Sequence, residues 1–391
     1  MRVFIIGVDG YLGWSLAQYL AHHGHVVSGM DNLSRRLQWR NKVGSDTILP
    51  IKSPSDRIAS FREVFGSNHF DHCAMDDASH ADNYYRVKDL FVRFKPDCIV
   101  NLAQMPSAPY SMIDYEKCYE THMNNIGTTL ALIWAIRENG RHIPIVTIGT
   151  AGEYGTPGIE IAEGYFEVTH KGRTAKMLFP RMTPASFYHA TKCHSSIDIE
   201  RSCAWWGLSA TDIMQSVVYG TRHQYMACEA GLNTRFDIDE VFGTAINRFV
   251  AQAVIGHPLT VYGDGTQKRG FLPLRDSMEC LRLIIEHPTQ PGEYRVVNQY
   301  DQIYQIKDLA QTVKEVAKKF GIDATIQMYE NPRVEQMGHF YSVEREKLLE
   351  MGYMPKGDIT TELEEMFLDV MPHKDIIEMR RDKIAPATKW M

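Results

Sequence analysis

Two side chains that could exchange a proton with a substrate stand four residues apart in the stretch SFYHATKCHSS (186–196). They are Tyr188 and Lys192, and on a helix this spacing places both side chains on one face. A phenol titrates near ~10 in water, so it acts as a base near neutral pH only where positive charge favours the phenolate. The Lys192 ammonium can supply part of that charge. Because this spacing also arises by chance, an exposed helical pair is the alternative interpretation.

Three further residues are candidates for the same chemistry. His189 directly follows Tyr188, and its ordinary pKa of ~6.5 suits proton transfer; a histidine packed against a sheet is the alternative. Thr150 ends the apolar run IPIVTIGT (143–150). Because ligands of a parallel sheet bind beyond the carboxyl ends of its strands, we expect the Thr150 hydroxyl beside a substrate hydroxyl. Glu153 is a second acid–base candidate, with a cap at the strand end as its alternative.

A glycine turn near the N-terminus predicts a phosphate-binding loop. Gly7, Gly10 and Gly13 are spaced three apart directly after the apolar run VFII (3–6), and Tyr11 and Leu12 complete the turn. A nucleotide pyrophosphate binds backbone N–H groups at the start of a helix, and glycine lets it come close. An ordinary tight turn is the alternative for this GxxGxxG spacing.

A carboxylate at the end of the next predicted strand extends this pattern. Asp31 follows Gly13 by 18 residues, where a carboxylate accepts hydrogen bonds from the adenine ribose. It would repel the 2′-phosphate of NADP, so the pattern favours NAD, although Arg35 and Arg36 soften this rule. A helix or turn cap is the alternative for Asp31. We assign these neighbouring residues to the adenosine end of the cofactor site as well: Asn32, Ser34, Asp76 and Asp77.

The elements that position these residues alternate in the first half of the chain. We expect strands over residues 2–7, 25–31, 73–76, 97–103 and 143–149, and helices over residues 11–23 and 121–138. This order predicts an α/β fold with a Rossmann-like, doubly wound parallel sheet. Residues 33–70 are predicted to be an insertion with some helix of its own.

After about residue 220 the alternation breaks, which predicts a smaller mixed α/β lobe that binds substrate. We expect helices over residues 240–255 and 308–320, and strands within 257–268 and 295–298. Residues 1–220 with about 271–298 then form the NAD-binding domain, and residues 221–270 with about 299–391 form the nucleotide-sugar lobe.

Bulk composition excludes several classes of protein. The net charge is -6 and no run of Lys or Arg occurs, which argues against a nucleic-acid partner. No apolar stretch approaches the ~18 residues of a membrane span, and the N-terminal strand leaves no room for a signal peptide. The seven cysteines are dispersed without a CxxC spacing. We therefore expect no disulfide framework and no metal site, and a cytoplasmic location.

The order of the glycine turn, Asp31, Thr150 and the Tyr188–Lys192 pair resembles the nucleotide-sugar epimerases and dehydratases of the extended short-chain dehydrogenase/reductase superfamily. Asn124 in NNIGT matches an asparagine of that superfamily. The resemblance implies a cofactor site that also includes Leu102, Ala103, Asn124 and Val218. It also implies that Lys192 holds the nicotinamide ribose and, with the positive nicotinamide ring, lowers the pKa of Tyr188.

Denser matches resemble the UDP-sulfoquinovose synthase family in particular. They include DGYLGW (9–14), SAPYSMID (107–114), GTAGEYGTP (149–157), VFGTAINRF (241–249) and NPRVE (331–335). The resemblance implies conversion of UDP-glucose and sulfite, or sulfite from a donor protein, to UDP-sulfoquinovose. The reaction proceeds through transient oxidation at sugar carbon 4, elimination, and addition of sulfite at carbon 6. A UDP-hexose 4-epimerase and a non-enzymatic NAD-binding protein are the alternatives.

The same resemblance implies roles for individual residues. Tyr188 takes the carbon-4 hydroxyl proton, Thr150 orients the group, and His189 serves carbons 5 and 6. Arg269 and Arg333 clamp the two phosphates, as guanidinium groups do. The superfamily usually dimerises through two long helices, here about 116–138 and 187–205, so we expect a homodimer. The expected substrate residues are Gln104, Ser107, Thr150, Gln215, Arg235, Thr244, Thr260, Tyr262, Gln267, Arg269 and Arg333.

Three departures from the resembled patterns matter for the chemistry. The 4,6-dehydratases carry an Asp-Glu pair after the strand-end threonine, where this chain has Ala151 and Gly152. The plant-type synthases carry an arginine just before SAPYSM, where this chain has Pro106. Since an anion such as sulfite needs a positive or N–H-rich pocket, the residues that bind it stay open. Val8 replaces a glycine of the usual turn, which requires a negative φ there.

Overall fold

The computed structural model describes residues 1–74, 78, 84–181, 185–226, 231–331 and 342–385, with side chains in 71–74 left aside. Its centre is a seven-stranded sheet in the order β12-β8-β5-β4-β1-β2-β3, and every neighbouring pair in it is parallel. The strands are β1 (Arg2–Ile6), β2 (Val26–Met30), β3 (Phe70–Ala74), β4 (Cys98–Asn101), β5 (Ile145–Ile148), β8 (Ala210–Gln215) and β12 (Tyr294–Gln299). The predicted doubly wound sheet is confirmed.

Successive side chains of the central strands enter two different cores, because a strand alternates its side chains between the faces of a sheet. In β1, Val3 and Ile5 point into one core, whereas Phe4 and Ile6 point into the other. Both faces are covered by helices, so these strands are apolar throughout rather than alternating with polar residues.

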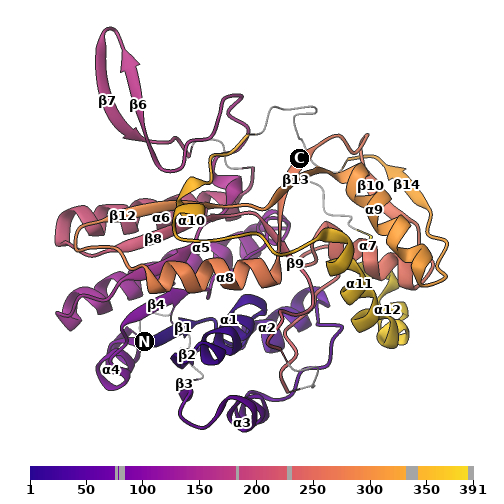
Figure 1. Cartoon of the computed structure of the whole chain (residues 1–391), viewed down its shortest axis with the longest axis horizontal. Coiled ribbons are helices and arrows are strands. Elements are labelled where there is room, and N and C mark those ends of the chain that lie inside the picture. Colours follow the sequence, from indigo (N-terminus) through magenta and orange to yellow (C-terminus); the bar gives the residue numbers. More distant parts are fainter. Residues whose placement is uncertain (75–77, 79–83, 182–184, 227–230, 332–341, 386–391) are drawn as a thin grey trace.

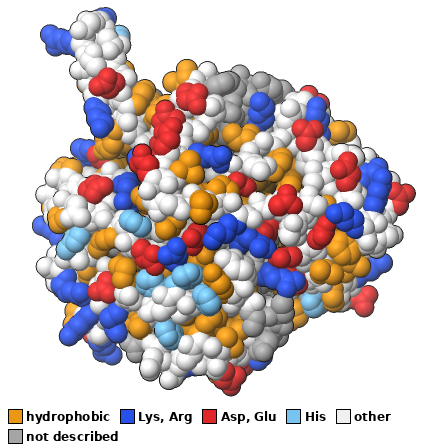
Figure 2. Space-filling view, viewed as in Figure 1, with side chains coloured by type: hydrophobic (Ala, Val, Ile, Leu, Met, Phe, Trp, Pro, Cys, Tyr) orange, Lys and Arg blue, Asp and Glu red, His pale blue; other side chains and the backbone are white. Residues whose placement is uncertain are grey.

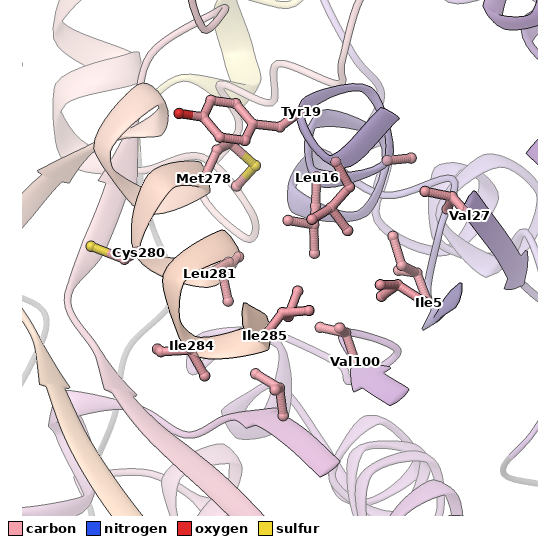
Figure 3. Packing of buried hydrophobic residues seen from close by; sticks show 14 of the residues in the cluster. Ile5, Leu16, Tyr19, Val27, Val100, Met278, Cys280, Leu281, Ile284 and Ile285 are labelled. Carbon is pink, nitrogen blue, oxygen red and sulfur yellow. The ribbon is translucent and has the colours of Figure 1, made fainter. Parts of the chain in front are cut away.

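The first core lies under α1 (Tyr11–His22), α3 (Pro54–Phe65) and α8 (Leu274–Glu286). Figure 3 shows Leu16 of α1 on the side that faces Leu281 and Ile285 of α8, and the Tyr19 ring beside Met278. Burial of each such side chain stabilises the fold by about 1.5–3 kcal/mol. This packing fixes the start of α1, and with it the glycine turn, against the end of β1.

The second core lies under α4 (Tyr84–Phe94), α5 (Tyr115–Asn139) and α6 (Phe187–Trp206), on the opposite face of the sheet. The helix α6 carries both Tyr188 and Lys192. It begins at Ser186, whose hydroxyl accepts a hydrogen bond from the backbone N–H of His189 at 3.3 Å. This cap starts the helix two residues before Tyr188.

A second lobe has its own core, built on α7 (Ala245–Val254), α9 (Ile306–Lys319) and α11 (Ile359–Val370). Figure 1 shows it beside the large sheet, on the right. Small sheets complete this lobe and connect it to the large sheet: β10 (Leu259–Tyr262) with β14 (Ile326–Tyr329), and β9 (Val217–Tyr219) with β11 (Lys268–Pro273) and β13 (Gln302–Gln305). Short helices lie at its periphery and beside β12: α2 (Ser34–Val43), α10 (Glu346–Glu350) and α12 (Lys374–Glu378).

A two-stranded hairpin, β6 (Tyr165–His170) with β7 (Arg173–Leu178), leaves the body of the molecule. Figures 1 and 2 show it projecting at the upper left. Phe166 packs against Phe179 at its base, with ring centres 5.2 Å apart. Among the described helices, none has the length and apolarity that crossing a bilayer would need.

Two predicted elements differ in their bounds. The sequence predicts a third strand over 73–76, whereas β3 spans Phe70–Ala74, because Phe70 pairs with Val27 of β2. The helix predicted over 240–255 begins only at Ala245. The Asp239 carboxylate accepts hydrogen bonds from the backbone N–H groups of Val241 and Phe242, both at 2.9 Å, and holds this segment in a turn.

Candidate active site

A cavity of about 570 Å³ lies at the carboxyl ends of the central strands and reaches the second lobe. Its walls come from the glycine turn, the ends of β4 and β5, the start of α6, and residues 235–248 and 269–270. A ligand at this edge of a parallel sheet meets the start of α1 and the ends of several strands at once. The cavity brings together most of the residues that the sequence singles out.

The glycine turn has the shape that a dinucleotide pyrophosphate needs. Gly7 has a φ of +86°, and a Cβ there would lie 2.7 Å from the backbone carbon of Leu102. A Cβ on Gly13 would lie 2.1 Å from the carbonyl oxygen of Gly7. Gly10 caps α1 without a side-chain hydrogen bond, so the N–H groups that follow it face the cavity. Among the described residues, positive φ outside glycine occurs only at Leu33, Lys95 and Lys171, so Val8 meets the requirement stated for it.

The glycine turn contains one carboxylate, that of Asp9, and two arginines outside the cavity neutralise its charge. Asp9 forms ion pairs with Arg36 (2.5 Å) and with the fully buried Arg57 (2.6 Å). Arg57 also donates to the carbonyl oxygens of Asp9 (3.0 Å) and Asn233 (2.9 Å). A phosphate at the turn is therefore spared the repulsion of a free carboxylate. Arg57 comes from the insertion, and the role of this residue was not predicted from the sequence.

The predicted adenosine end lies in the same cavity. The Asp31 carboxylate accepts hydrogen bonds from the backbone N–H groups of Asp9 (2.9 Å) and Leu33 (2.8 Å). Burial, with the Asp9 charge, raises the pKa of Asp31 to about 6. Asn32, Ser34 and Arg35 line the cavity, whereas Arg36 turns to Asp9 outside it. Asp76 and Asp77 lie outside the described residues.

The residues predicted to surround the nicotinamide end of NAD also lie in the wall of this cavity. Leu102, Ala103, Asn124 and Val218 line the cavity. The Asn124 side chain donates to the carbonyl oxygen of Ala103 at 3.1 Å, which fixes α5 against the end of β4. The glycine turn and the Asp31 carboxylate thus fit an NAD molecule lying across the ends of β1, β2 and β4.

Thr150, Tyr188 and Lys192 converge at the end of β5. The Thr150 hydroxyl lies near enough to the Tyr188 phenol to favour the phenolate and so to lower its pKa. The Lys192 ammonium lies 5.7 Å from the centre of the Tyr188 ring. It donates to the carbonyl oxygen of Ile148 at 2.7 Å and to the Gln104 side chain. The predicted one-sided placement of Tyr188 and Lys192 is present in α6, facing the cavity rather than solvent.

The charges of the protein do not by themselves lower the pKa of the Tyr188 phenol. Burial, and then the Glu153 carboxylate, raise the pKa of Tyr188 well above its ordinary value, against the influence of the Thr150 hydroxyl. Burial also lowers the pKa of Lys192 to about 8. The predicted lowering of the phenol pKa includes the positive nicotinamide ring, so it stays a prediction.

His189 lines the cavity beside Tyr188, with ring centres 5.0 Å apart. Its Nδ1 lies 2.9 Å from the Ser186 hydroxyl. A Cβ on Gly152 would lie 2.3 Å from both Cδ2 and Nε2 of this ring. The imidazole thus occupies the space over Gly152 that any larger residue would need, and its Nε2 edge faces the segment that follows Thr150.

Residues 3–298 match the family model described as the NAD dependent epimerase/dehydratase family. The chain belongs to this family. It is an NAD-dependent enzyme of the α/β Rossmann type. Among curated relatives, the UDP-sulfoquinovose synthase of Sulfolobus acidocaldarius is 42% identical, over 100% of this chain and 98% of that protein. The chloroplastic UDP-sulfoquinovose synthase of Spinacia oleracea is 39% identical, over 100% of this chain and 79% of that protein.

Solved structures of the same family share the fold. The NAD complex of UDP-glucose 4-epimerase from Thermus thermophilus has a TM-score of 0.64 at 19% identity, over 95% of this chain and 99% of that chain. The UDP-glucuronic acid 4-epimerase of Bacillus cereus, with UDP-glucuronic acid and NAD, has a TM-score of 0.64 at 20% identity, over 97% of this chain and 100% of that chain. At such low identity these likenesses establish the fold of the family alone.

Within this family fold, the predicted substrate residues divide into three groups. Those that line the cavity are Gln104, Ser107, Thr150, Gln215, Arg235, Thr244 and Arg269. Three others do not line it. These are Thr260, Tyr262 and Gln267: the Thr260 hydroxyl accepts from Gln252 of α7, and the Gln267 side chain donates to the carbonyl oxygen of Tyr262. Arg333 lies outside the described residues.

A buried charge network lies behind Thr150. Glu153 is fully buried, and its carboxylate accepts from the Thr150 backbone N–H at 3.0 Å and from the Ser196 hydroxyl at 3.2 Å. Arg181 lies 3.5 Å from Glu153 and 3.0 Å from Asp212. Glu153 is therefore the strand-end cap given as its alternative interpretation, part of a capping box with Thr150 that ties the end of β5 to α6, and it does not line the cavity. The ion pairs of Arg181 are the part of this network that the sequence did not indicate.

Proposed function

We propose that this chain converts UDP-glucose and sulfite to UDP-sulfoquinovose, with NAD as a resident cofactor. The observation that carries the proposal is the full-length similarity to two enzymes named UDP-sulfoquinovose synthase, together with the Thr150–Tyr188–Lys192–His189 group in one cavity. The net reaction replaces the carbon-6 hydroxyl of the sugar by a sulfonate and releases water.

When bound, NAD supplies a reversible hydride acceptor for sugar carbon 4. The chain's own residues manage the protons. Tyr188 takes the proton of the carbon-4 hydroxyl, and Thr150, whose hydroxyl favours the phenolate of Tyr188, orients the same hydroxyl. Since burial raises the pKa of Tyr188, the phenol needs a positive charge other than Lys192 alone, and a cationic nicotinamide ring beside it would provide one.

His189 is the residue placed to act at carbons 5 and 6. Its ring stands over Gly152, where a sequence of the 4,6-dehydratase type would carry an acidic side chain. We infer that the imidazole removes the carbon-5 proton and delivers a proton to the departing carbon-6 hydroxyl. General acid–base catalysis of this kind contributes about 10²–10⁴-fold to a rate.

The second lobe is proposed to hold the uridine diphosphate. Thr244 caps α7, since its hydroxyl accepts from the Asn247 backbone N–H at 3.3 Å, so the start of that helix faces the cavity. Arg248 and Arg269 also line the cavity there. A helix start with nearby guanidinium groups suits a diphosphate.

We further propose a homodimer formed through α5 and α6. Met123, Leu130 and Trp134 of α5 are exposed by 41–45%, and Ile197 and Trp205 of α6 by 58% and 68%. Apolar side chains at such spacings on adjacent helices favour a second copy of the same surface. Ile197→Glu is expected to give a monomer in sedimentation experiments, whereas a wild-type protein that sediments as a monomer would contradict this.

We also keep a cytoplasmic location as part of the proposal. The described cysteines are free, and Cys98, Cys203 and Cys280 are buried thiols, as is usual in a reducing compartment.

Mass spectrometry of the products of UDP-glucose, with and without sulfite, tests the function. The synthase forms a sulfonated nucleotide sugar only with sulfite. Formation of UDP-galactose without sulfite would instead identify a UDP-hexose 4-epimerase. Tyr188→Phe removes the base while keeping the ring, and is expected to stop either reaction.

A further inference from the structure

A second cavity, of about 270 Å³, lies next to the active site and is lined by four arginines and a single carboxylate. The arginines are Arg36, Arg40, Arg235 and Arg380, and the carboxylate is Asp46. They come from three separate parts of the chain: the insertion, the second lobe and the C-terminal segment that follows α12. Arg36 pairs with Asp9, and Arg40, Arg235 and Arg380 all lie within 4 Å of Asp46. Since this one lining carboxylate is shared by three guanidinium groups, the cavity keeps positive charge, which suits a small anion.

Arg235 connects this cavity to the active site, because it lines both. The residue is only 1% exposed. One guanidinium nitrogen donates to Asp237 at 3.2 Å, whereas Nε and NH1 have no hydrogen-bond partner within the described part of the chain. Burial of a charged group with unmet donors is costly. A ligand that brings acceptor oxygens to Arg235 would satisfy these donors.

Of the other arginines, Arg380 is held in the wall of the cavity and Arg40 lies at its mouth. Arg380 donates to the carbonyl oxygens of Asp46 (2.7 Å) and Thr47 (3.1 Å), which holds its guanidinium in place. The Arg40 side chain is 62% exposed and touches Asp46 at 3.3 Å, so it lies at the mouth. Asp9 and Asp237, the nearby carboxylates, are each shared with a further arginine, Arg57 or Arg35.

Size and lining select the class of ligand. The cavity, at about 270 Å³, has room for an inorganic oxyanion with water around it, and its guanidinium lining favours an anion. Ile48 and Leu49 behind the arginines are buried. Apolar backing lowers the local dielectric constant and strengthens each charge-assisted hydrogen bond.

We propose that this arginine cavity binds sulfite and supplies it to the sugar through Arg235. The inference rests on the proposed function, and it gives the anion a positive site although Pro106 stands where the resembled synthases carry an arginine. Arg235 is the residue through which the two cavities adjoin, since it belongs to the lining of both.

The primary variant is Arg40→Gln, because Arg40 is exposed and holds no backbone group. With NAD and saturating UDP-glucose, its KM for sulfite is expected to rise about tenfold, as for loss of one charge-assisted hydrogen bond, while KM for UDP-glucose stays within about twofold. Arg380→Gln should act in the same direction and add to it. Arg93→Gln, on the exposed face of α4, is the matched control and should change neither constant.

A calorimetric titration with inorganic sulfate separates failure of this inference from failure of the proposed function. NAD and UDP are present, so that the phosphate sites of the larger cavity are filled. We expect sulfate to bind wild type and to bind Arg40→Gln about tenfold more weakly. Equal sulfate binding by both proteins, or an unchanged KM for sulfite, would overturn the arginine cavity as the anion site. If wild type forms no sulfosugar, the proposed function fails while the sulfate titration still decides the binding site.

Discussion

The imidazole of His189 stands directly over Gly152: a Cβ on this glycine would lie 2.3 Å from its Cδ2 and Nε2 atoms. The two residues come from different elements, His189 from α6 and Gly152 from the turn after β5. Position 152 needs glycine because the His189 ring leaves no room for a Cβ. The backbone does not require it, since Gly152 is not among the glycines with positive φ.

Gly152→Ala should therefore displace the His189 ring. We expect kcat for sulfosugar formation to fall by at least about 10², the lower bound for loss of an acid–base group, with a stability loss of about 1–3 kcal/mol from overpacking. The control is the double variant Gly152→Ala/His189→Ala, which should recover stability but not activity. Full activity in Gly152→Ala would show that the ring position does not matter.

Gly13→Ala tests the pyrophosphate turn. The added Cβ would meet the carbonyl oxygen of Gly7 at 2.1 Å, and backbone cannot move aside as a flexible side chain can. NAD affinity measured by calorimetry should fall at least about tenfold, because the N–H groups of the turn are displaced. Gly140→Asn serves as the control: this helix-ending glycine has a φ of +74° and no atom within 4 Å of a Cβ, and Asn tolerates that conformation. An unchanged NAD affinity in Gly13→Ala would refute the predicted site.

Lys192→Met should separate stability from function. Burial lowers the pKa of Lys192 to about 8, whereas an unfolded lysine titrates near ~10.4. Between these values the unfolded state binds more protons, so the free energy of unfolding of wild type rises with pH in that window. The cost of the buried ammonium is fully present below pH ~8. We expect the variant to be inactive, yet more stable at neutral pH by an amount on the order of a few kcal/mol.

Urea unfolding of both proteins at neutral pH and near pH ~10 measures this effect. The stability difference should shrink at the higher pH, where wild type is neutral at this position. A variant that is less stable than wild type at both pH values would show that the hydrogen bonds to Gln104 and Ile148 outweigh the cost of burial.

Glu153→Gln should shift the pH dependence of catalysis. Its carboxylate raises the pKa of Tyr188, so removing the charge lowers that pKa and moves the acidic limb of kcat to lower pH. Burial raises the pKa of Glu153 itself to about 7. Between pH ~4.3 and ~7 the native state therefore binds more protons than the unfolded state, so the free energy of unfolding of wild type falls as pH rises through that window. The Glu153→Gln variant should not show this decrease.

The matched control is Glu163→Gln. Glu163 is another carboxylate whose pKa burial raises, but its partners are the backbone N–H groups of Asn298 (2.8 Å) and Lys347 (2.9 Å), away from the cavity. Its pH–rate profile should match that of wild type. A Glu153→Gln profile that also coincides with wild type would contradict the electrostatic role given to Glu153.

Local patterns were enough to predict the sheet and the residues that face the main cavity. Gly7, Asp31 and Thr150 follow apolar strands, and the carboxyl ends of parallel strands meet at one edge, so their proximity follows from the sequence. The sequence is less informative where position depends on distant partners. The Thr260 hydroxyl is taken by Gln252 of α7, and nothing in the spacing of β10 reveals that contact.

The charge networks were hidden for the same reason. Arg57 reaches Asp9 across 48 residues and Arg181 reaches Asp212 across 31, and each pair joins an irregular segment to a regular element. A sequence shows that such charges exist but not which of them meet. The rise in the pKa of Tyr188 through burial was not visible in the sequence either, because burial depends on how the whole site packs.

We expect one cavity to oxidise carbon 4 of UDP-glucose transiently, to restore it, and to exchange the carbon-6 hydroxyl for a sulfonate. UDP-glucose deuterated at carbon 4, incubated with sulfite and analysed by mass spectrometry and NMR, tests this most directly. The account predicts a sulfonated nucleotide sugar that keeps its carbon-4 deuterium in wild type, and unreacted substrate with Tyr188→Phe. A sulfonated product formed equally well by Tyr188→Phe, or a wild-type product without sulfur that is inverted at carbon 4, would contradict it.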